Sequence, residues 1–213
     1  MSFPKIASIL NGMFPDAHCE LFHKTPYQLL VSVVLSAQTT DKKVNECMTP
    51  LYKKGFTPQI AVKMGPGSIL KQIKSIGLAP TKSKNVYNLS NILIEEFRGK
   101  VPRYREDLES LPGVGRKTAN VVLAEIYGEP TLAVDTHVYR VTKRLGLHDE
   151  STPAKSEMRL LEIIHKKYLP KVHHQFIFLG RRLCKARKPL CEECKLRSHC
   201  AYYKDEFKKG GKP

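Results

Sequence analysis

The sequence predicts an all-α protein with two helical lobes, and three observations lead to this fold class. Apolar residues recur at steps of three and four, as one buried face of a helix requires, for example at Val86, Leu89, Leu93 and Phe97. Residues that start and stop helices stand between such series. No long stretch alternates apolar and polar residues, so no segment demands a β-strand. We therefore expect roughly ten short helices.

The ends of the predicted helices can be followed along the chain. Thr57-Pro58 and Thr152-Pro153 each combine an N-cap threonine with proline at the first helical position. Four glycines stand where helices are expected to end: Gly55, Gly77, Gly99 and Gly146. Two further apolar series predict one helix that ends near Tyr127 and another near residues 158–168: Ala119, Val122, Leu123 and Ile126, then Met158, Leu161, Ile164 and Tyr168.

A change in composition near residue 130 divides the chain. The segment of about residues 20–130 holds most of the apolar periodicity, and Glu129-Pro130 marks its end. The segment that follows is richer in His, Arg and Cys. With 213 residues, 41% of them hydrophobic, the chain can bury one good core or two small ones. Two helical lobes with a groove between them would suit a long, charged ligand.

The chain is strongly basic, with a formal net charge of +16 and a pI of about 9.6. Such a charge favours a polyanionic partner, most commonly nucleic acid, and supplies affinity without reading a base sequence. No membrane partner is expected, because the longest apolar run, Leu29–Leu35, is interrupted by Ser32. Residues Met1–Leu10 lack the features of a secretory signal, so we expect a cytoplasmic protein.

Four cysteines lie close together in the spacing C-x6-C-x2-C-x5-C: Cys184, Cys191, Cys194 and Cys200. Cysteines this close are expected either to form a disulfide or to bind a zinc ion or an iron–sulfur cluster that neutralises their thiolates. Disulfides are rare in the cytosol. Zinc sites usually combine two short-gapped pairs, whereas only the middle two cysteines form one here. The unequal gaps on either side of the middle pair, of six and five residues, suit a [4Fe–4S] cluster with one thiolate per iron. The spacing favours the cluster and leaves zinc open.

The segment Leu111-Pro-Gly-Val-Gly115 separates two predicted helices, over about residues 104–110 and 116–127. Its proline ends the first helix, while Gly113 and Gly115 permit positive φ and leave their amides uncovered. Free N–H groups at the start of the second helix then form an anion site for one phosphate. A helix–hairpin–helix element of this kind grips the DNA backbone. The alternative is a plain turn between helices.

Two charged residues near residue 130 are candidate catalytic groups. Lys117 follows Arg116 in the first turn of the second hairpin helix, where the helix dipole disfavours a cation. It is either a solvated phosphate-binding lysine or a nucleophile. Asp135, in Val134-Asp-Thr-His137, is well placed as an N-cap. An N-cap carboxylate has a fixed orientation and can also be catalytic, with His137 and Arg140 as supporting residues.

Four motifs in this order resemble the endonuclease III family: Leu35-Ser-Ala-Gln-Thr-Thr-Asp41, Leu111-Pro-Gly-Val-Gly-Arg-Lys-Thr-Ala119, Val134-Asp-Thr-His137 and the cysteine array. The resemblance spans about residues 4–203. It implies the helix–hairpin–helix DNA glycosylase fold, with a DNA groove between two helical lobes. Residues 20–130 would form a six-helix barrel, with the helix–hairpin–helix near 108–127. Residues 1–19 and 131–213 would form a [4Fe–4S] cluster domain.

The resemblance also implies an activity, that of a bifunctional DNA glycosylase/AP lyase of base excision repair that removes oxidised pyrimidines. Lys117 matches the nucleophile that forms a Schiff base, and Asp135 matches the essential carboxylate. The related adenine glycosylases lack this lysine and carry a further C-terminal domain, and the 8-oxoguanine branch generally lacks the cluster. The implied partner is double-stranded DNA with damaged pyrimidines or abasic sites, bound by a monomer in the cytoplasm at the nucleoid.

DNA-binding roles follow from the same resemblance. Gln38 would fill the gap left by a flipped nucleotide, and Leu78 would wedge into the opposite strand; their plain alternatives are a polar helix end and a hydrophobic contact. Gly113, Gly115 and Arg116 would grip a phosphate. A basic loop held between the first two cluster cysteines would meet the backbone through Lys185, Arg187 and Lys188, unless these are only a solvated charge run.

Three rival functions stay open at this point: a monofunctional glycosylase, a non-enzymatic zinc-containing DNA-binding module, and a redox sensor that binds DNA through the hairpin. The basic tail from Lys204 to Lys212 is expected to have a non-specific role.

Overall fold

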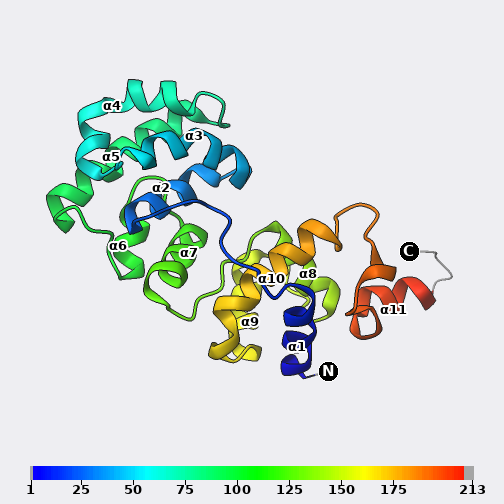
Figure 1. The fold of residues 1–213 in the computed structure, drawn as a ribbon. Helices are drawn as coiled ribbons and strands as arrows, with labels where there is room; N and C mark the ends of the chain where they lie inside the picture. Colours follow the sequence, from blue (N-terminus) through cyan, green and yellow to red (C-terminus); the bar gives the residue numbers. More distant parts are fainter. Residues whose placement is uncertain (1, 209–213) are drawn as a thin grey trace. The chain divides into compact units, whose positions relative to one another are not determined.

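The structure is a computed structural model that describes residues 2–208, and this range contains eleven α-helices, three short 3-10 helices and no strand (Figure 1). The predicted all-α fold class is confirmed. The chain divides into two compact units, Glu20–Gly128 and Met1–Cys19 with Glu129–Pro213. The labels of barrel domain and cluster domain stay predictions. Residues 209–212 of the predicted basic tail lie outside the described residues.

Six helices make up the unit Glu20–Gly128: α2 (Pro26–Ser36), α3 (Asp41–Lys53), α4 (Pro58–Ile73), α5 (Ala79–Phe97), α6 (Arg105–Ser110) and α7 (Arg116–Tyr127). Helix α2 is its centre and contacts α3, α5 and α7. Every residue from Tyr27 to Leu35 is buried, as expected of a helix that is apolar all round. Its buried hydroxyl is satisfied, because Ser32 Oγ lies 2.6 Å from the Tyr52 hydroxyl.

Threonine side chains start three of these helices, so the local sequence positions them directly. Thr25, Thr40 and Thr57 each accept a hydrogen bond of 3.3 Å from the backbone N–H three residues later. Each thereby satisfies an N–H group that the helix itself cannot pair. The helix start predicted at Thr57-Pro58 is confirmed, as is the one at Thr152-Pro153 in the other unit.

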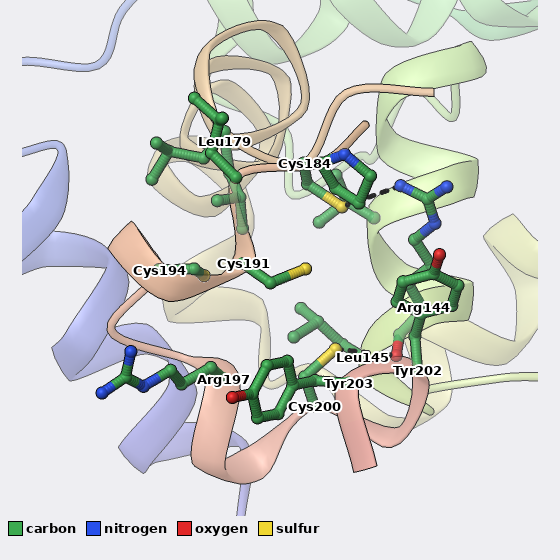
Figure 2. A pocket seen from close by; sticks show the side chains of 14 residues that line it. Arg144, Leu145, Leu179, Cys184, Cys191, Cys194, Arg197, Cys200, Tyr202 and Tyr203 are labelled. Atoms are coloured by element: carbon green, nitrogen blue, oxygen red, sulfur yellow. Dashed lines mark hydrogen bonds between the residues drawn. The ribbon is translucent and has the colours of Figure 1, made fainter. Parts of the chain in front are cut away.

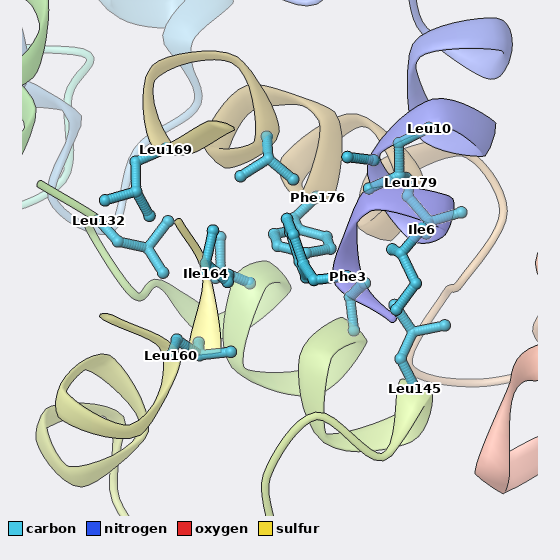
Figure 3. Packing of buried hydrophobic residues seen from close by; sticks show 14 of the residues in the cluster. Phe3, Ile6, Leu10, Leu132, Leu145, Leu160, Ile164, Leu169, Phe176 and Leu179 are labelled. Atoms are coloured by element: carbon cyan, nitrogen blue, oxygen red, sulfur yellow. The ribbon is translucent and has the colours of Figure 1, made fainter. Parts of the chain in front are cut away.

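The other unit contains α1 (Phe3–Met13), α8 (Thr136–Leu145), α9 (Pro153–Ile163), α10 (Leu169–Arg182), α11 (Ala201–Lys208) and the 3-10 helices η1 (Lys166–Tyr168), η2 (Cys191–Glu193) and η3 (Arg197–His199). Figure 3 shows its core, in which Phe176 of α10 lies among side chains of α1, α8 and α9. Gln175 donates 3.2 Å to the Phe14 carbonyl, so the two ends of the chain share this core.

The core-facing side of α9 differs from the prediction. Met158 and Leu161 are 58% and 37% exposed, whereas Ser156, Glu157 and Leu160 are buried. The spacing of apolar residues predicted the wrong buried face of α9, because the face that is buried carries polar side chains. Ser156, for example, donates 2.8 Å to the Thr152 carbonyl. Only Ile164, just after the helix, is buried as expected.

Within residues 2–208, no helix combines the length and apolar character that a membrane span requires.

Candidate active site and cluster site

The hairpin places Lys117 and Arg116 on the exposed first turn of α7. Gly113, between α6 and α7, has φ +83°, and a Cβ there would lie 2.7 Å from Nδ2 of Asn85 on α5. Glycine is therefore required twice over, by backbone conformation and by close packing. Val114 closes the turn by donating 3.0 Å to the Leu111 carbonyl.

Gly115 is the N-cap of α7, and it does not adopt the positive φ that glycine permits. Its φ is −106° and ψ 179°, an extended conformation typical of an N-cap. A Cβ there would meet nothing within 4 Å. Glycine at this position has no side chain that could cap α7. The first turn of α7 also contains no acidic residue. The amides at the helix start thus face an open approach for an anion.

Gln38 and Leu78 both adopt the left-handed backbone conformation, with φ +56° and +60°. Non-glycine residues rarely do so, and such strain gathers at functional sites. Gln38 is exposed just beyond α2, and Leu78 is 57% exposed at the N-cap of α5. The two turns approach each other, because a Cβ on Gly77 would lie 3.6 Å from the Gln38 carbonyl oxygen.

Asp135 is the N-cap of α8, as predicted from the local sequence. Its Oδ1 accepts 2.7 Å from the Val138 N–H, which fixes the orientation of a half-buried carboxylate. His137 follows in the first turn. Burial lowers the pKa of His137, the Asp135 charge opposes this, and the guanidinium groups of Arg140 and Arg181 add to the lowering. Asp135 belongs to one unit and Lys117 to the other.

The four predicted cluster cysteines line one cavity of about 390 Å³, counted with the solvent at its mouth. Figure 2 shows the sulfurs of Cys184, Cys191 and Cys200 turned toward a common space. No cysteine forms a disulfide. Among the described residues, no three His, Cys, Asp or Glu side chains converge as one metal ion requires.

The chemistry of the thiols fits a cationic iron cluster. Burial raises the pKa of Cys194 and of Cys200, and the neighbouring thiols raise both further. Burial and the nearby Cys184 and Cys200 do the same to Cys191. Thiolates so placed are unfavourable together unless a bound metal cation neutralises them. The cavity and the donor set together therefore fit a four-iron cluster with one thiolate per iron.

Two arginines of α8 hold the loop that begins at Cys184. Arg140, predicted as a supporting residue, donates 3.0 Å from Nε to the Cys184 carbonyl and 3.0 Å to the Gly180 carbonyl. Arg144, one turn later, donates to Cys184 Sγ at 3.5 Å (Figure 2). It also donates to the carbonyls of Lys185 and Ala186 at 2.7 and 3.1 Å. Sequence reasoning missed Arg144, because a basic residue in the last turn of a helix is ordinary.

The loop between the first two cysteines presents its basic side chains to solvent. Lys185, Arg187 and Lys188 are all exposed, and Lys188 has φ +50°. Arg144 donates to two main-chain carbonyls of this loop, so these contacts fix the loop through its backbone. These three residues lie between Cys184 and Cys191 of the cysteine array, and their contact with DNA stays a prediction.

Comparison with known proteins identifies the class. Residues 31–166 match the HhH-GPD superfamily of base excision DNA repair proteins, and residues 184–200 match the iron–sulfur binding domain of endonuclease III. Endonuclease III of Rickettsia felis is 46% identical over 93% of both chains, and that of Escherichia coli is 41% identical over 93% of this chain and 94% of the relative. The fold and the hairpin thus define a helix–hairpin–helix DNA repair protein.

Within that class, the chain belongs to the endonuclease III family. A solved non-covalent endonuclease III–DNA complex is 43% identical and superposes with a TM-score of 0.91 over 97% of both chains. A trapped endonuclease III–DNA covalent intermediate gives 43% identity and a TM-score of 0.90. The chain is a DNA glycosylase with AP lyase activity, and its cofactor is a [4Fe–4S] cluster. The predicted family, activity and cofactor are confirmed.

Proposed function

We propose that Lys117 and Asp135 carry out the glycosylase and lyase steps, and that the damaged bases are oxidised pyrimidines. The observation that carries this proposal is the position of Lys117, an exposed residue on the first turn of α7, directly after the hairpin that we propose binds a phosphate. A phosphate bound at the hairpin amides would bring a nucleotide within reach of that side chain.

The proposed first step is a substitution at the sugar. The neutral Nζ of Lys117 forms a bond to C1′ as the bond from C1′ to the base breaks, and the departing base takes up a proton. Positive charge develops on the sugar, so an anionic Asp135 stabilises the transition state and assists proton transfer. Its N-cap hydrogen bond to Val138 holds the carboxylate in one orientation.

The second step is strand cleavage from the Schiff base. Opening of the sugar ring leaves C1′ double-bonded to the Lys117 nitrogen, and this iminium makes the C2′ proton acidic. Loss of that proton expels the 3′ phosphate by β-elimination, so the strand breaks on the 3′ side. Water then releases the sugar fragment and regenerates the amine. Lys117 thereby separates a bifunctional enzyme from one that only hydrolyses the glycosidic bond.

Access to the base requires that it leave the duplex, which costs a few kcal/mol of unstacking. We propose that Gln38 fills the vacated space and Leu78 enters the opposite strand. Their exposed positions on two adjoining strained turns support these roles. Phosphate contacts would offset the cost, at Gly113, Gly115 and Arg116 in the hairpin and at Lys185, Arg187 and Lys188 in the cluster loop.

The [4Fe–4S] cluster, held by Cys184, Cys191, Cys194 and Cys200, would act structurally by fixing both ends of the basic loop. We place the enzyme in the cytoplasm, at the nucleoid, where its double-stranded DNA substrate would be found.

The test uses a duplex with a single oxidised pyrimidine and reduction with borohydride, which traps a Schiff base. Lys117→Gln should yield no trapped adduct and no strand cleavage. Asp135→Asn should lower the rate of base release by about 10²–10⁴-fold, while the fold is kept because asparagine is an equally good N-cap. Lys71→Gln, at an exposed position of α4, is the matched control and should behave as wild type.

Base release by Lys117→Gln at the wild-type rate would instead favour a monofunctional glycosylase. If both variants kept full activity, the catalytic assignment would be wrong. A colourless preparation containing zinc would support the DNA-binding module, since a [4Fe–4S] protein absorbs near 400 nm.

A further inference from the structure

Lys82, a residue without a role so far, has its ammonium group buried at the base of the Gln38 turn. The residue is only 4% exposed, and burial lowers the pKa of its amine. Its Nζ donates to the Leu35 carbonyl at 2.9 Å, to the Ala37 carbonyl at 2.6 Å and to Thr39 Oγ1 at 3.1 Å. An ammonium has three N–H donors, so these three acceptors satisfy it fully.

The acceptors lie on both sides of Gln38. Leu35 is in the last turn of α2, and Ala37 and Thr39 are the direct neighbours of Gln38. Helix α2 has no basic residue in its own last turn. Lys82 therefore supplies, from α5, the cation that the carbonyl end of α2 attracts. Because it binds the residues before and after Gln38, it holds that residue in its left-handed conformation.

The same lysine is joined to Leu78 through its backbone. Its N–H donates 3.0 Å to the Leu78 carbonyl in the first hydrogen bond of α5. Leu78 has φ +60°, and the residue before it, Gly77, packs near the Gln38 carbonyl and Thr39 Oγ1. A single residue thus connects the two strained turns, with its backbone on one and its side chain on the other.

We propose that Lys82 is a positioning residue for DNA intrusion, setting Gln38 and Leu78 in the geometry that holds a damaged nucleotide out of the duplex. The proposal rests on the DNA-binding roles proposed for those two residues. Burial of an ammonium is unfavourable in itself, and the strain of two left-handed residues adds to that cost. This cost is offset if the arrangement keeps Gln38 and Leu78 rigidly placed to displace a base pair. A small misplacement of such side chains strongly reduces the reaction rate.

The test compares two substrates of the holoenzyme. A duplex with an oxidised pyrimidine needs intrusion, whereas a single-stranded oligonucleotide with an abasic site has no opposite strand and reports only on the lysine chemistry. Lys82→Met keeps the length of the side chain and removes its charge. We expect it to lower the rate on the duplex by about 10–100-fold and borohydride trapping on the single strand by less than about 3-fold.

A spectroscopic signal measures the intrusion itself. With 2-aminopurine opposite an abasic site, insertion into the opposite strand raises fluorescence, and Lys82→Met should reduce that rise. Lys84→Met removes the same charge from an exposed position of α5, and it measures how much of any loss comes from charge alone. If Lys82→Met does not fold, Thr39→Val replaces it. That variant removes one acceptor and should slow the duplex reaction by about 3–10-fold.

Equal losses on both substrates, or no loss on the duplex beyond that of Lys84→Met, would overturn the proposal and leave Lys82 as a helix cap. These results are separate from a failure of the catalytic assignment. That failure would show as trapping on the single strand that survives Lys117→Gln.

Discussion

Single atoms decide several features of this protein, and Gly180 is the clearest case. It lies inside α10, where a Cβ would be 2.9 Å from Cβ and 3.1 Å from Nδ1 of His137 on α8. His137 is two residues from Asp135, so this close approach fixes the start of α8 near the proposed catalytic carboxylate. The backbone at Gly180 is helical and would accept most residues, so glycine is needed here for close packing and not for its backbone conformation.

Gly180→Ala should therefore destabilise the protein, although alanine is the better helix former. The clash with His137 is expected to cost about 1–3 kcal/mol, more than the roughly 1 kcal/mol that alanine contributes in a helix. The control is Gly12→Ala in α1, at an exposed site where a Cβ would meet nothing within 4 Å. It should be neutral or stabilising. Urea unfolding followed by circular dichroism measures both, and equal effects would contradict the packing argument.

Helix α8 joins the two candidate sites of its unit. It begins at Asp135, and its last turn carries Arg144, which reaches the sulfur of Cys184 and two carbonyls of the basic loop. The Arg144 guanidinium also lies 4.6 Å from the ring centroid of Tyr202 on α11. Hydrogen bonds to the groups around a metal ligand commonly tune how firmly the metal is held.

Arg144→Met should loosen the cluster site while keeping much of the apolar stem. We expect the absorbance near 400 nm to decay about 10-fold faster in the presence of an iron chelator. Arg159→Met is the matched control, because the contacts of Arg159 are with Glu162 on the surface of α9. Equal decay rates for the two variants would show that Arg144 does not secure the cluster.

The molecule as a whole is dominated by its positive charge of +16. Affinity for DNA that arises from phosphate neutralisation falls with salt, and the slope of log affinity against log salt counts the contacts. The charge alone does not say which side chains make them. The structure presents Lys185, Arg187 and Lys188 on a loop tied down by Arg144, which makes them proposed contacts.

The triple variant Lys185→Gln, Arg187→Gln and Lys188→Gln should reduce the salt slope of DNA binding by about 3. A control of equal charge, Lys155→Gln, Arg159→Gln and Lys166→Gln, alters exposed residues of α9 and η1 and should leave the slope unchanged. Titration by fluorescence anisotropy at several salt concentrations gives both slopes. A similar reduction in the two variants would mean that the loop contributes only net charge.

The local sequence by itself determined the helical class, several helix starts, the hairpin and the cysteine array. These features depend on neighbours in the chain: an N-cap threonine pairs three residues ahead, and Asp135 pairs with Val138 in the same way. Family resemblance then supplied the activity and the cofactor, which the comparisons confirmed. The buried face of α9 was mispredicted because a polar side chain can be buried once it finds a partner.

Tertiary structure alone decided the contacts between distant residues. In the sequence, Lys82 looks like an ordinary surface lysine, and its contact with Leu35, 47 residues earlier, forms only in the folded protein. The contact of Arg144 with Cys184, 40 residues later, likewise depends on the fold. The left-handed turns at Gln38 and Leu78 likewise lie close to each other although they are remote in the sequence. Local rules describe what a residue prefers, whereas these features exist because several remote groups must be satisfied at once.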